Sequence, residues 1–397
     1  MEEIQIQEVP QQAQPVVNSK TQKPQRKIIQ GDGVIKSILS PSSVLIAGPS
    51  KGGPPPEIIV LFESVDTPRM RGRSPFDIWA YEFREILRKK CIGKKCHFIT
   101  TQDVNRQGED PSSSTKRRFG RVILDDGKED LTKFLVLNGM AIVRDPKIDI
   151  QRLPEDSRAY FNQLKDLQEQ ARDKNYRLHN PAARPEYTET ETDLDVNTFF
   201  SQNQGKIVPA VVEYVVSSSY LRVSVRVDDK IYQLALQLSH VQTPEYRRQA
   251  PQESSEQIHP PFAEESRFFV ERELLQRDVE LTLDRITPGS RISARIQAPK
   301  GDLGEVLLKL GYGRLVGIQQ KGTGNGDLPP DVADRYRQAQ EQAQNERLRI
   351  WKDYQPRPIN ASAELAKAEI PENFFALVAE VPQADTLVII PIRTYIE

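Results

Sequence analysis

Short apolar runs and polar turns alternate along the first 180 residues, a pattern that predicts strands joined by turns. The predicted strands are residues 33–39, 44–47, 58–62, 96–100 and 118–124. Helices are predicted at 131–137 and at 154–174, where apolar residues recur on one helical face. Ser74-Pro75 predicts the start of a further helix, with Ser74 as its N-cap, and Gly93 predicts the end of that helix.

The same succession of elements returns in the second half of the chain. Val65-Asp66-Thr67-Pro68 follows the third predicted strand, and Val241-Gln242-Thr243-Pro244 follows the third strand of the second copy. Proline suits a strand end because it has no N–H to donate to a ladder. Strands of the second copy are predicted at 208–216, 221–225, 231–238, 279–283 and 292–297, and helices from residue 261 and at 303–310 and 331–351.

These elements predict two complete domains, residues 29–180 and 206–356. Residues 1–28, rich in Gln, Pro and Lys, are expected to form a disordered tail. Residues 181–205 are expected to be a linker, either a plain spacer or an acidic segment that docks on the basic first domain. Residues 372–397 predict two strands that begin a third copy. Because two strands cannot bury a core, we expect a piece of a longer repeat protein or a hairpin that packs on the second domain.

Charge is distributed unevenly, although the formal net charge is -1. Residues 27–180 hold 27 Lys and Arg against 21 Asp and Glu, whereas residues 181–397 hold 25 against 32. The basic first half indicates either a polyanion-binding face or an ordinary solvated surface. No apolar run approaches the roughly 20 residues that span a bilayer, so no membrane partner is expected. Cys91 and Cys96 match neither a disulfide framework nor a zinc pattern, and we expect buried, unreactive thiols.

The order of three strands, a helix, two strands and two helices resembles the staphylococcal-nuclease fold, an OB-type five-stranded barrel. Tandem copies in one chain resemble the Tudor-SN family. The resemblance therefore implies an α+β chain of tandem staphylococcal-nuclease-like OB-type five-stranded barrels, each with three helices. The motifs that match are residues 52–57 (GGPPPE), 83–94 (FREILRKKCIGK), 262–265 (FAEE), 274–279 (LLQRDV) and 347–354 (RLRIWKDY).

The resemblance also implies a Ca²⁺-dependent phosphodiesterase site with two aspartates on the metal, two arginines on the phosphate and a glutamate beside the attacking water. The first aspartate belongs to the turn between the first two strands, where this chain has Ser40–Ser43 and Ser217–Tyr220. At the second aspartate position the first copy keeps Asp66, the candidate metal ligand, whereas the second copy has Gln242.

The positions of the glutamate and the two arginines are also only partly retained. In the first copy they hold Arg69, Leu61 and Arg117, or Arg118 by a shift of one residue, with Arg121 as a weaker match. In the second copy they hold Glu245, Gln237 and Arg291. Neither copy retains more than two of the five groups, so each barrel alone is expected to lack the parent mechanism. The remaining candidate catalytic residues are Glu245, Arg291 and Arg117.

Basic residues of the first copy are the main candidates for nucleic-acid binding. They are Arg69, Arg71, Arg73, Arg88, Lys89, Lys90, Lys94, Lys95, Lys116, Arg117, Arg118 and Arg121. Loops of an OB-type barrel face nucleic acid, so these cations are expected to line a phosphate track. Alternatively, the cluster at 88–95 lies at a helix C-terminus, where cations complement the helix dipole.

Three functions remain open. The first is an RNA-binding and scaffolding module for silencing or other RNA metabolism, with degenerate nuclease sites and no cofactor required for binding. The second is a Ca²⁺-dependent ribonuclease for structured or inosine-containing RNA, which would need a composite site of Asp66 and Arg117 with Glu245 and Arg291. The third is a protein-binding platform for ribonucleoprotein or transcription complexes. The resemblance implies RNA and silencing-complex proteins as partners, in the cytoplasm and also the nucleus.

Overall fold

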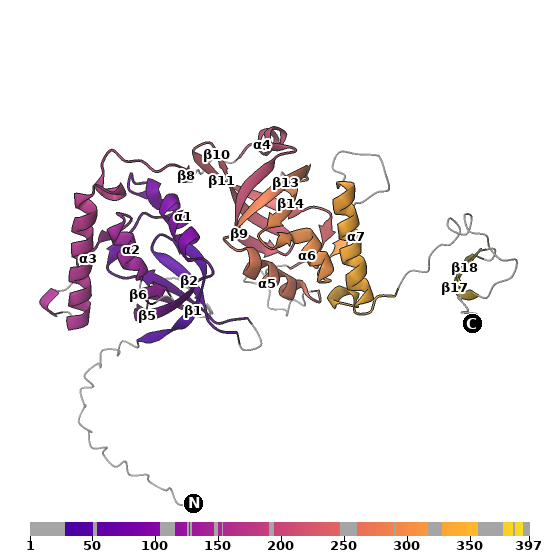
Figure 1. Cartoon of the computed structure of the whole chain (residues 1–397), viewed down its shortest axis with the longest axis horizontal. Coiled ribbons are helices and arrows are strands. Elements are labelled where there is room, and N and C mark those ends of the chain that lie inside the picture. The colour runs from indigo at the N-terminus through magenta and orange to yellow at the C-terminus, as the bar shows by residue number, and fades with distance from the viewer. Residues whose placement is uncertain are drawn as a thin grey trace, which may run out of the picture. The chain divides into compact units, whose positions relative to one another are not determined.

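The computed structural model describes residues 28–50, 54–103, 116–124, 127, 129–146, 150–152, 154–189, 194–246, 260–289, 291–316, 328–355, 376–383 and 386–391. Two compact units are present: unit 1 comprises Met1–Glu191 with Asp228–Lys230, and unit 2 comprises Thr192–Val227 and Ile231–Glu397 (Figure 1). The predicted tail lies outside the described residues, apart from Ile28.

Unit 1 is a closed barrel in the strand order β1-β2-β3-β6-β5. Its strands are β1 (Ile29–Ser40), β2 (Ser43–Ala47), β3 (Glu57–Phe62), β5 (Lys95–Asp103) and β6 (Lys116–Leu124). The pairing of β3 with β6 is parallel, whereas the other pairs are antiparallel. Side chains at alternate positions point inward, so Val44, Ile46, Val60 and Phe62 are buried in the barrel.

Three helices cover the barrel of unit 1: α1 (Ala80–Cys91), α2 (Leu131–Leu137) and α3 (Glu155–Asp173). Short 3-10 turns lie at Asp77–Trp79, Ile150–Arg152 and Arg177–His179, and β4 (Val65–Asp66) pairs with β7 (Ile142–Val143). The predicted start of the first helix at Ser74 is wrong. Ser74 instead donates its hydroxyl to Asp77 (2.7 Å) within the preceding loop, so α1 begins only after the 3-10 turn.

Unit 2 repeats this plan. The ring of its barrel contains β9 (Ile207–Ser217), β10 (Tyr220–Val227), β11 (Lys230–Leu238), β13 (Asp278–Thr287) and β14 (Arg291–Ala298). Parallel pairing of β11 with β14 closes the ring, as β3 and β6 do in unit 1. The expected α+β architecture of OB-type five-stranded barrels is therefore confirmed.

Four helices, one more than expected, belong to unit 2. They are α4 (Val196–Asn203), α5 (Ala263–Leu274), α6 (Leu303–Lys309) and α7 (Pro330–Asn345), followed by a 3-10 turn at Arg349–Trp351. Short strands β12 (Val241–Gln242) and β16 (Arg314–Leu315) pair with each other, and β15 (Gly301–Asp302) extends the sheet beside β14. None of the described helices combines the length and apolar character that crossing a membrane requires.

The segment 181–205, expected to be a linker, contains ordered structure. It includes β8 (Thr188–Glu189) and helix α4, whose N-cap Asp195 accepts hydrogen bonds from Asn197 and Thr198. The part before β8 packs on α1: the Glu186 N–H donates to Glu82 (2.8 Å), and the rings of Tyr187 and Tyr81 meet edge-on. A plain spacer therefore does not describe these residues.

A two-stranded antiparallel hairpin of β17 (Ala376–Gln383) and β18 (Thr386–Pro391) occupies the region where a third copy was expected. Residues 372–375 and 392–397 lie outside the described part of the chain.

Candidate nucleic-acid interface

A pocket in unit 2, here named pocket A, gathers the positions at which the nuclease groups were expected. It has a volume of ≈ 450 Å³ and lies where the β9–β10 turn, the end of β11 and the start of β14 meet. Its lining includes Ser217, Ser219, Tyr220, Gln237, Gln242, Glu245 and Arg291. The structure thus brings Glu245 and Arg291 into one pocket, although they are 46 positions apart in the sequence.

Hydroxyl groups replace the metal-binding carboxylate in the turn of pocket A. Ser219 accepts a hydrogen bond from the Thr243 hydroxyl (3.0 Å), and Ser218 shares one with Ser266 (3.0 Å). Calcium in proteins takes 6–8 oxygen ligands, with carboxylates among them. Glu245 is the one carboxylate among the described lining residues. No group of three or more His, Cys, Asp or Glu that fits a metal occurs in the described residues. The residues present therefore do not fit Ca²⁺.

Arg291 is exposed and its guanidinium lies over the ring of Tyr220, 5.1 Å from the ring centroid. Stacking on an aromatic face orients the planar guanidinium without consuming its N–H donors. Arg285 also lines pocket A but lies 3.4 Å from the Asp284 carboxylate. Arg291 is therefore the residue of pocket A best placed to bind a phosphate, and exposed Glu245 adds the only acidic side chain of the described lining.

The sequence patterns did not reveal a buried histidine–aspartate pair next to pocket A. His240 lines the pocket with only 4% of its surface exposed and has a left-handed backbone (φ 59°). Its Nε2 lies 3.5 Å from Oδ2 of Asp284, which also accepts from Ser293 (3.4 Å). No local signal in the sequence marks this pair, because His240 lies between β11 and β12 and Asp284 is 44 positions further along the chain.

In unit 1 the candidate metal ligand Asp66 forms an ion pair instead. Its carboxylate lies 3.2 Å from the Arg144 guanidinium, which also donates to the Val65 carbonyl. The turn where the family has its other aspartate holds serines, and the Ser40 and Ser43 hydroxyls bond to each other (2.6 Å). An arginine beside the only retained aspartate makes a cation site unfavourable.

Strand register distinguishes Arg117 from Arg118 as the counterpart of Arg291. In unit 2, Gln237 pairs with Ser293, two residues after Arg291. In unit 1, the equivalent Leu61 pairs with Phe119, two residues after Arg117. Arg118 points into the barrel and is 2% exposed, so it is inaccessible to an external ligand.

Comparison with known proteins agrees with this architecture. The protein family described as staphylococcal nuclease homologue matches residues 235–353, which include most of unit 2. Staphylococcal nuclease domain-containing protein 1 of Drosophila melanogaster is 30% identical over 345 residues, 81% of this chain and 33% of that protein. Ribonuclease TUDOR 1 of Arabidopsis thaliana is 26% identical over 408 residues, 90% of this chain and 39% of that protein.

The chain belongs to the Tudor-SN-like proteins with staphylococcal-nuclease-like domains. A Schizosaccharomyces pombe protein, also named staphylococcal nuclease domain-containing protein 1, is 26% identical over 329 residues, 81% of this chain and 34% of that protein. The chain thus spans between 33% and 39% of the length of these curated relatives.

Several basic side chains that were candidates for RNA binding instead form ion pairs within the Tudor-SN-like fold. Arg88 is 3% exposed and forms a two-pronged ion pair with Glu85, with both N···O distances 2.7 Å. Lys90 pairs with Glu129 (2.7 Å) and lies over the ring of Phe134. Arg88 is thus paired within α1, whereas Lys90 connects the end of α1 to Glu129 and to Phe134 of α2.

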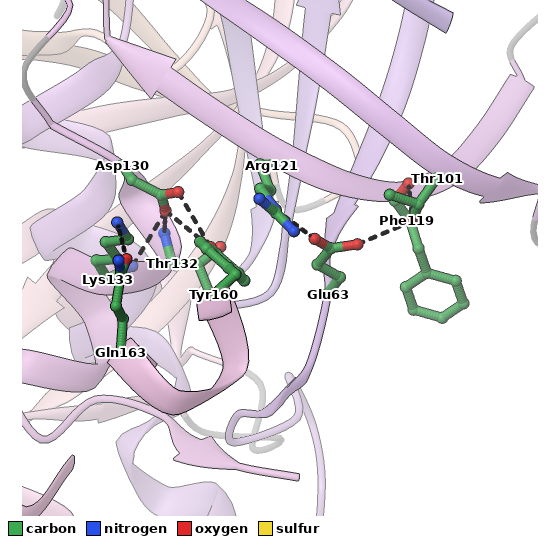
Figure 2. Close-up of polar contacts among 9 residues, drawn as sticks. All are labelled: Glu63, Thr101, Phe119, Arg121, Asp130, Thr132, Lys133, Tyr160 and Gln163. Carbon is green, nitrogen blue, oxygen red and sulfur yellow. Dashed lines mark hydrogen bonds and ion pairs between the residues drawn. The ribbon is translucent and has the colours of Figure 1, made fainter. Parts of the chain in front are cut away.

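Arg121 is likewise part of an internal network. Figure 2 shows it between Glu63, which binds its Nε, and Tyr160, whose ring centroid is 3.5 Å from the guanidinium. The Tyr160 hydroxyl donates to Asp130 (3.0 Å), and burial raises the pKa of Tyr160 above its usual range. Asp130 in turn caps α2, so the network joins the barrel to two helices.

The remaining cations lie at the surface. Arg69, Arg71, Arg73, Lys89, Lys94 and Lys95 are exposed, whereas the side chain of Lys116 lies outside the described structure. Asp77 organises the loop with the three arginines, because it accepts from the backbone N–H of Arg69 (2.8 Å) and from Ser74. Burial opposes ionisation of Asp77, but these hydrogen bonds hold its pKa below the usual value. Arg71 has a left-handed backbone (φ 58°) and lies 3.9 Å from Glu189.

Both cysteines are buried and form no disulfide with each other, as expected. Burial raises the pKa of Cys91 to about 12, although Lys90 and Lys94 act in the opposite direction. The thiolate that reacts with oxidants or binds metals is therefore scarce at neutral pH.

Proposed function

We propose that this chain is an RNA-binding and scaffolding module of RNA metabolism, in which pocket A binds RNA phosphates without a catalytic metal. The observation that carries the proposal is pocket A itself. It keeps Arg291 and Glu245 at nuclease positions but holds Ser219 and Gln242 where the metal aspartates belong. Arginine and hydroxyl donors bind phosphate directly, whereas the loss of carboxylates removes the ion that would activate water.

A Ca²⁺-dependent ribonuclease is the second candidate, since relatives carry the name Ribonuclease TUDOR. It would act on structured or inosine-containing RNA and would combine Asp66 and Arg117 with Glu245 and Arg291. Against it stand the Asp66–Arg144 pair and the hydroxyl-lined turn of pocket A.

One experiment separates the two candidates. End-labelled single-stranded, duplex and inosine-containing duplex RNAs are incubated with the full chain in Ca²⁺ or chelator, and binding is followed by gel shift in the same samples. We expect a salt-sensitive shift that is equal in Ca²⁺ and chelator, with intact RNA. Ca²⁺-dependent cleavage that disappears in Glu245→Gln or Asp66→Asn would refute the proposal. Absence of both signals would favour a protein-binding platform.

Partners and location follow from the same proposal. We expect association with ribonucleoprotein or silencing-complex proteins in the cytoplasm and also in the nucleus. The association should weaken after RNase treatment if RNA forms the link, whereas RNase-resistant association would place the scaffolding surface on protein contacts.

A further inference from the structure

A second cavity of unit 2, here named pocket B, adjoins pocket A. The two share Gln242 and Thr243 in their linings. Pocket B has a volume of ≈ 620 Å³, within the roughly 300–1,000 Å³ typical of ligand sites. None of the nuclease positions discussed above belongs to pocket B except Gln242, so the parent catalytic site does not account for it.

Flat apolar rings form one part of the lining of pocket B. These rings belong to Pro244, Pro260, Pro261 and Phe262, and Ile350 also lines the pocket. Phe262 immediately precedes α5, has a left-handed backbone (φ 68°) and packs against the core of unit 2 while remaining partly exposed. Its ring is therefore held in place by packing, which lowers the entropic cost of stacking a planar ligand on it.

Positively charged side chains form the other part of the lining of pocket B. Arg314, Arg349 and Lys352 line pocket B, and Asp353 is the one carboxylate among the described lining residues. Arg349 is committed to Glu265 (2.9 Å) and to the Leu310 carbonyl (2.7 Å). Arg314 and Lys352 are exposed and form no ion pair within the part of the chain that the structure describes. Arg314 lies over the ring of Trp351 (5.2 Å), which orients its guanidinium.

We infer that a single RNA strand bound in pocket A continues across Gln242 and Thr243 into pocket B. A base of the strand stacks on Phe262 and the adjacent proline rings, and Arg314 and Lys352 bind the flanking phosphates. Aromatic platforms beside a cationic groove are the general means of binding single strands without sequence preference. The inference rests on the proposed RNA binding at pocket A. Continuity with that pocket, lined by Arg291 and hydroxyls, favours RNA over an acidic protein segment.

Length dependence of binding tests this path in the full chain. Single-stranded RNAs from a dinucleotide to an octanucleotide are titrated against wild type and the double variant Arg314→Gln/Lys352→Gln. Because two phosphates are no longer neutralised, the slope of log K against log salt should fall by about 1.4 for the octanucleotide, at roughly 0.7 per phosphate. The dinucleotide, which fits in pocket A alone, should bind both proteins equally.

The matched control is Lys206→Gln/Lys309→Gln, which removes the same charge from exposed residues of unit 2 that line neither pocket. We expect this control to bind the octanucleotide like wild type. Equal losses of affinity in both double variants, or full octanucleotide affinity in Arg314→Gln/Lys352→Gln, would overturn the inference while leaving RNA binding intact. A wild-type chain that binds none of the RNAs would instead refute the proposed function.

Crosslinking in the wild-type chain gives an independent readout that needs no variant. An octanucleotide with one 4-thiouridine is irradiated in complex with the protein, and the modified peptides are identified. Crosslinks within residues 260–262 or 349–353 are expected for thiouridine next to the nucleotide in pocket A. Crosslinks confined to other parts of unit 2 would contradict the path.

Discussion

Replacement of single side chains decides what pocket A can do. Carboxylates at two positions would hold a cation, but Ser219 and Gln242 occupy them and Ser219 is already bonded to Thr243. A hydroxyl offers a neutral dipole, which binds a phosphate oxygen by donating a hydrogen bond and binds Ca²⁺ only weakly. The cations that line the pocket are Arg285, which lies 3.4 Å from Asp284, and Arg291, so we expect the pocket to bind an anion rather than a metal.

Arg291→Gln should therefore weaken RNA binding at least tenfold, because a charge-assisted hydrogen bond contributes about 1.5–3 kcal/mol and 1.4 kcal/mol is a factor of ten. Glu245→Gln should bind RNA at least as well as wild type, since it removes a negative charge near the phosphate. Arg222→Gln, an exposed arginine of β10 outside pocket A, serves as the control of equal charge. Fluorescence anisotropy with a short RNA measures all three, and equal affinities of Arg291→Gln and Arg222→Gln would contradict this role.

A surface carboxylate of unit 2 gives a pH prediction. A hydrogen bond from the Tyr312 hydroxyl (2.7 Å) and the nearby Arg349 guanidinium lower the pKa of Glu265, although burial acts against them. A folded-state pKa below the unfolded one stabilises the protein above the ordinary value of 4.5, and this stabilisation is lost as the pH falls below it.

The melting temperature of wild type should therefore fall more steeply between neutral pH and pH about 3 than that of Glu265→Gln. Glu341→Gln, at an exposed position of α7, should follow wild type and controls for loss of one negative charge. Parallel pH profiles for Glu265→Gln and wild type would show that this carboxylate has the same pKa in both states.

At the scale of elements, the two units use the same contacts to attach helices to their barrels. Tyr160 bonds to Asp130 at the cap of α2, and Tyr336 bonds to Asp302 at the cap of α6. After each short helix comes a glycine with positive φ, Gly139 (64°) and Gly311 (69°). A carbonyl from the chain beyond the long helix approaches each glycine closely, so the same backbone junction is built twice.

Gly139→Ala should destabilise unit 1 strongly because an added Cβ would lie 2.5 Å from the Tyr176 carbonyl oxygen. Gly127 also has a positive φ (66°) but has nothing within 4 Å of the added atom. Gly127→Ala should therefore cost only the left-handed strain of about 1–2 kcal/mol, and Gly139→Ala should cost clearly more. Chemical denaturation measures both free energies of unfolding, and equal losses of stability would show that the junction relaxes around a methyl group.

The elements were predictable where their signals are local. Short apolar runs located the ten barrel strands, and the helices α2 and α6 were found because short apolar runs end at Gly139 and Gly311. Contacts between distant positions were not predictable. Sequence alone marks Arg88 as a surface cation and Asp66 as a ligand, whereas the fold encloses Arg88 with Glu85 and brings Arg144 beside Asp66. Helix α4 was missed because its eight residues lie in a polar stretch.

At the scale of the whole molecule, charge separates the two halves. Residues 27–180 carry a surplus of six positive charges (27 minus 21) and residues 181–397 a surplus of seven negative charges (32 minus 25). Arg88, Lys90, Arg118 and Arg121 are buried or paired within the fold, so the positive field of unit 1 comes from its exposed cations, among which Arg69, Arg71 and Arg73 share one loop. RNA affinity at low salt should therefore depend on this loop as well as on pocket A.

Replacing Arg69, Arg71 and Arg73 together by Gln should lower RNA affinity and reduce the salt slope by about 0.7 for each phosphate that the loop no longer binds. The control Arg172→Gln/Lys174→Gln/Arg184→Gln removes the same charge from exposed positions elsewhere in unit 1. If long-range field alone attracts RNA, the two triple variants should lose affinity equally, because the net charge changes equally. Direct binding at the loop requires a larger loss of affinity and a smaller slope in the first variant, and these should persist at high salt, where distant charges are screened. Unchanged affinity in both would assign binding to unit 2 alone.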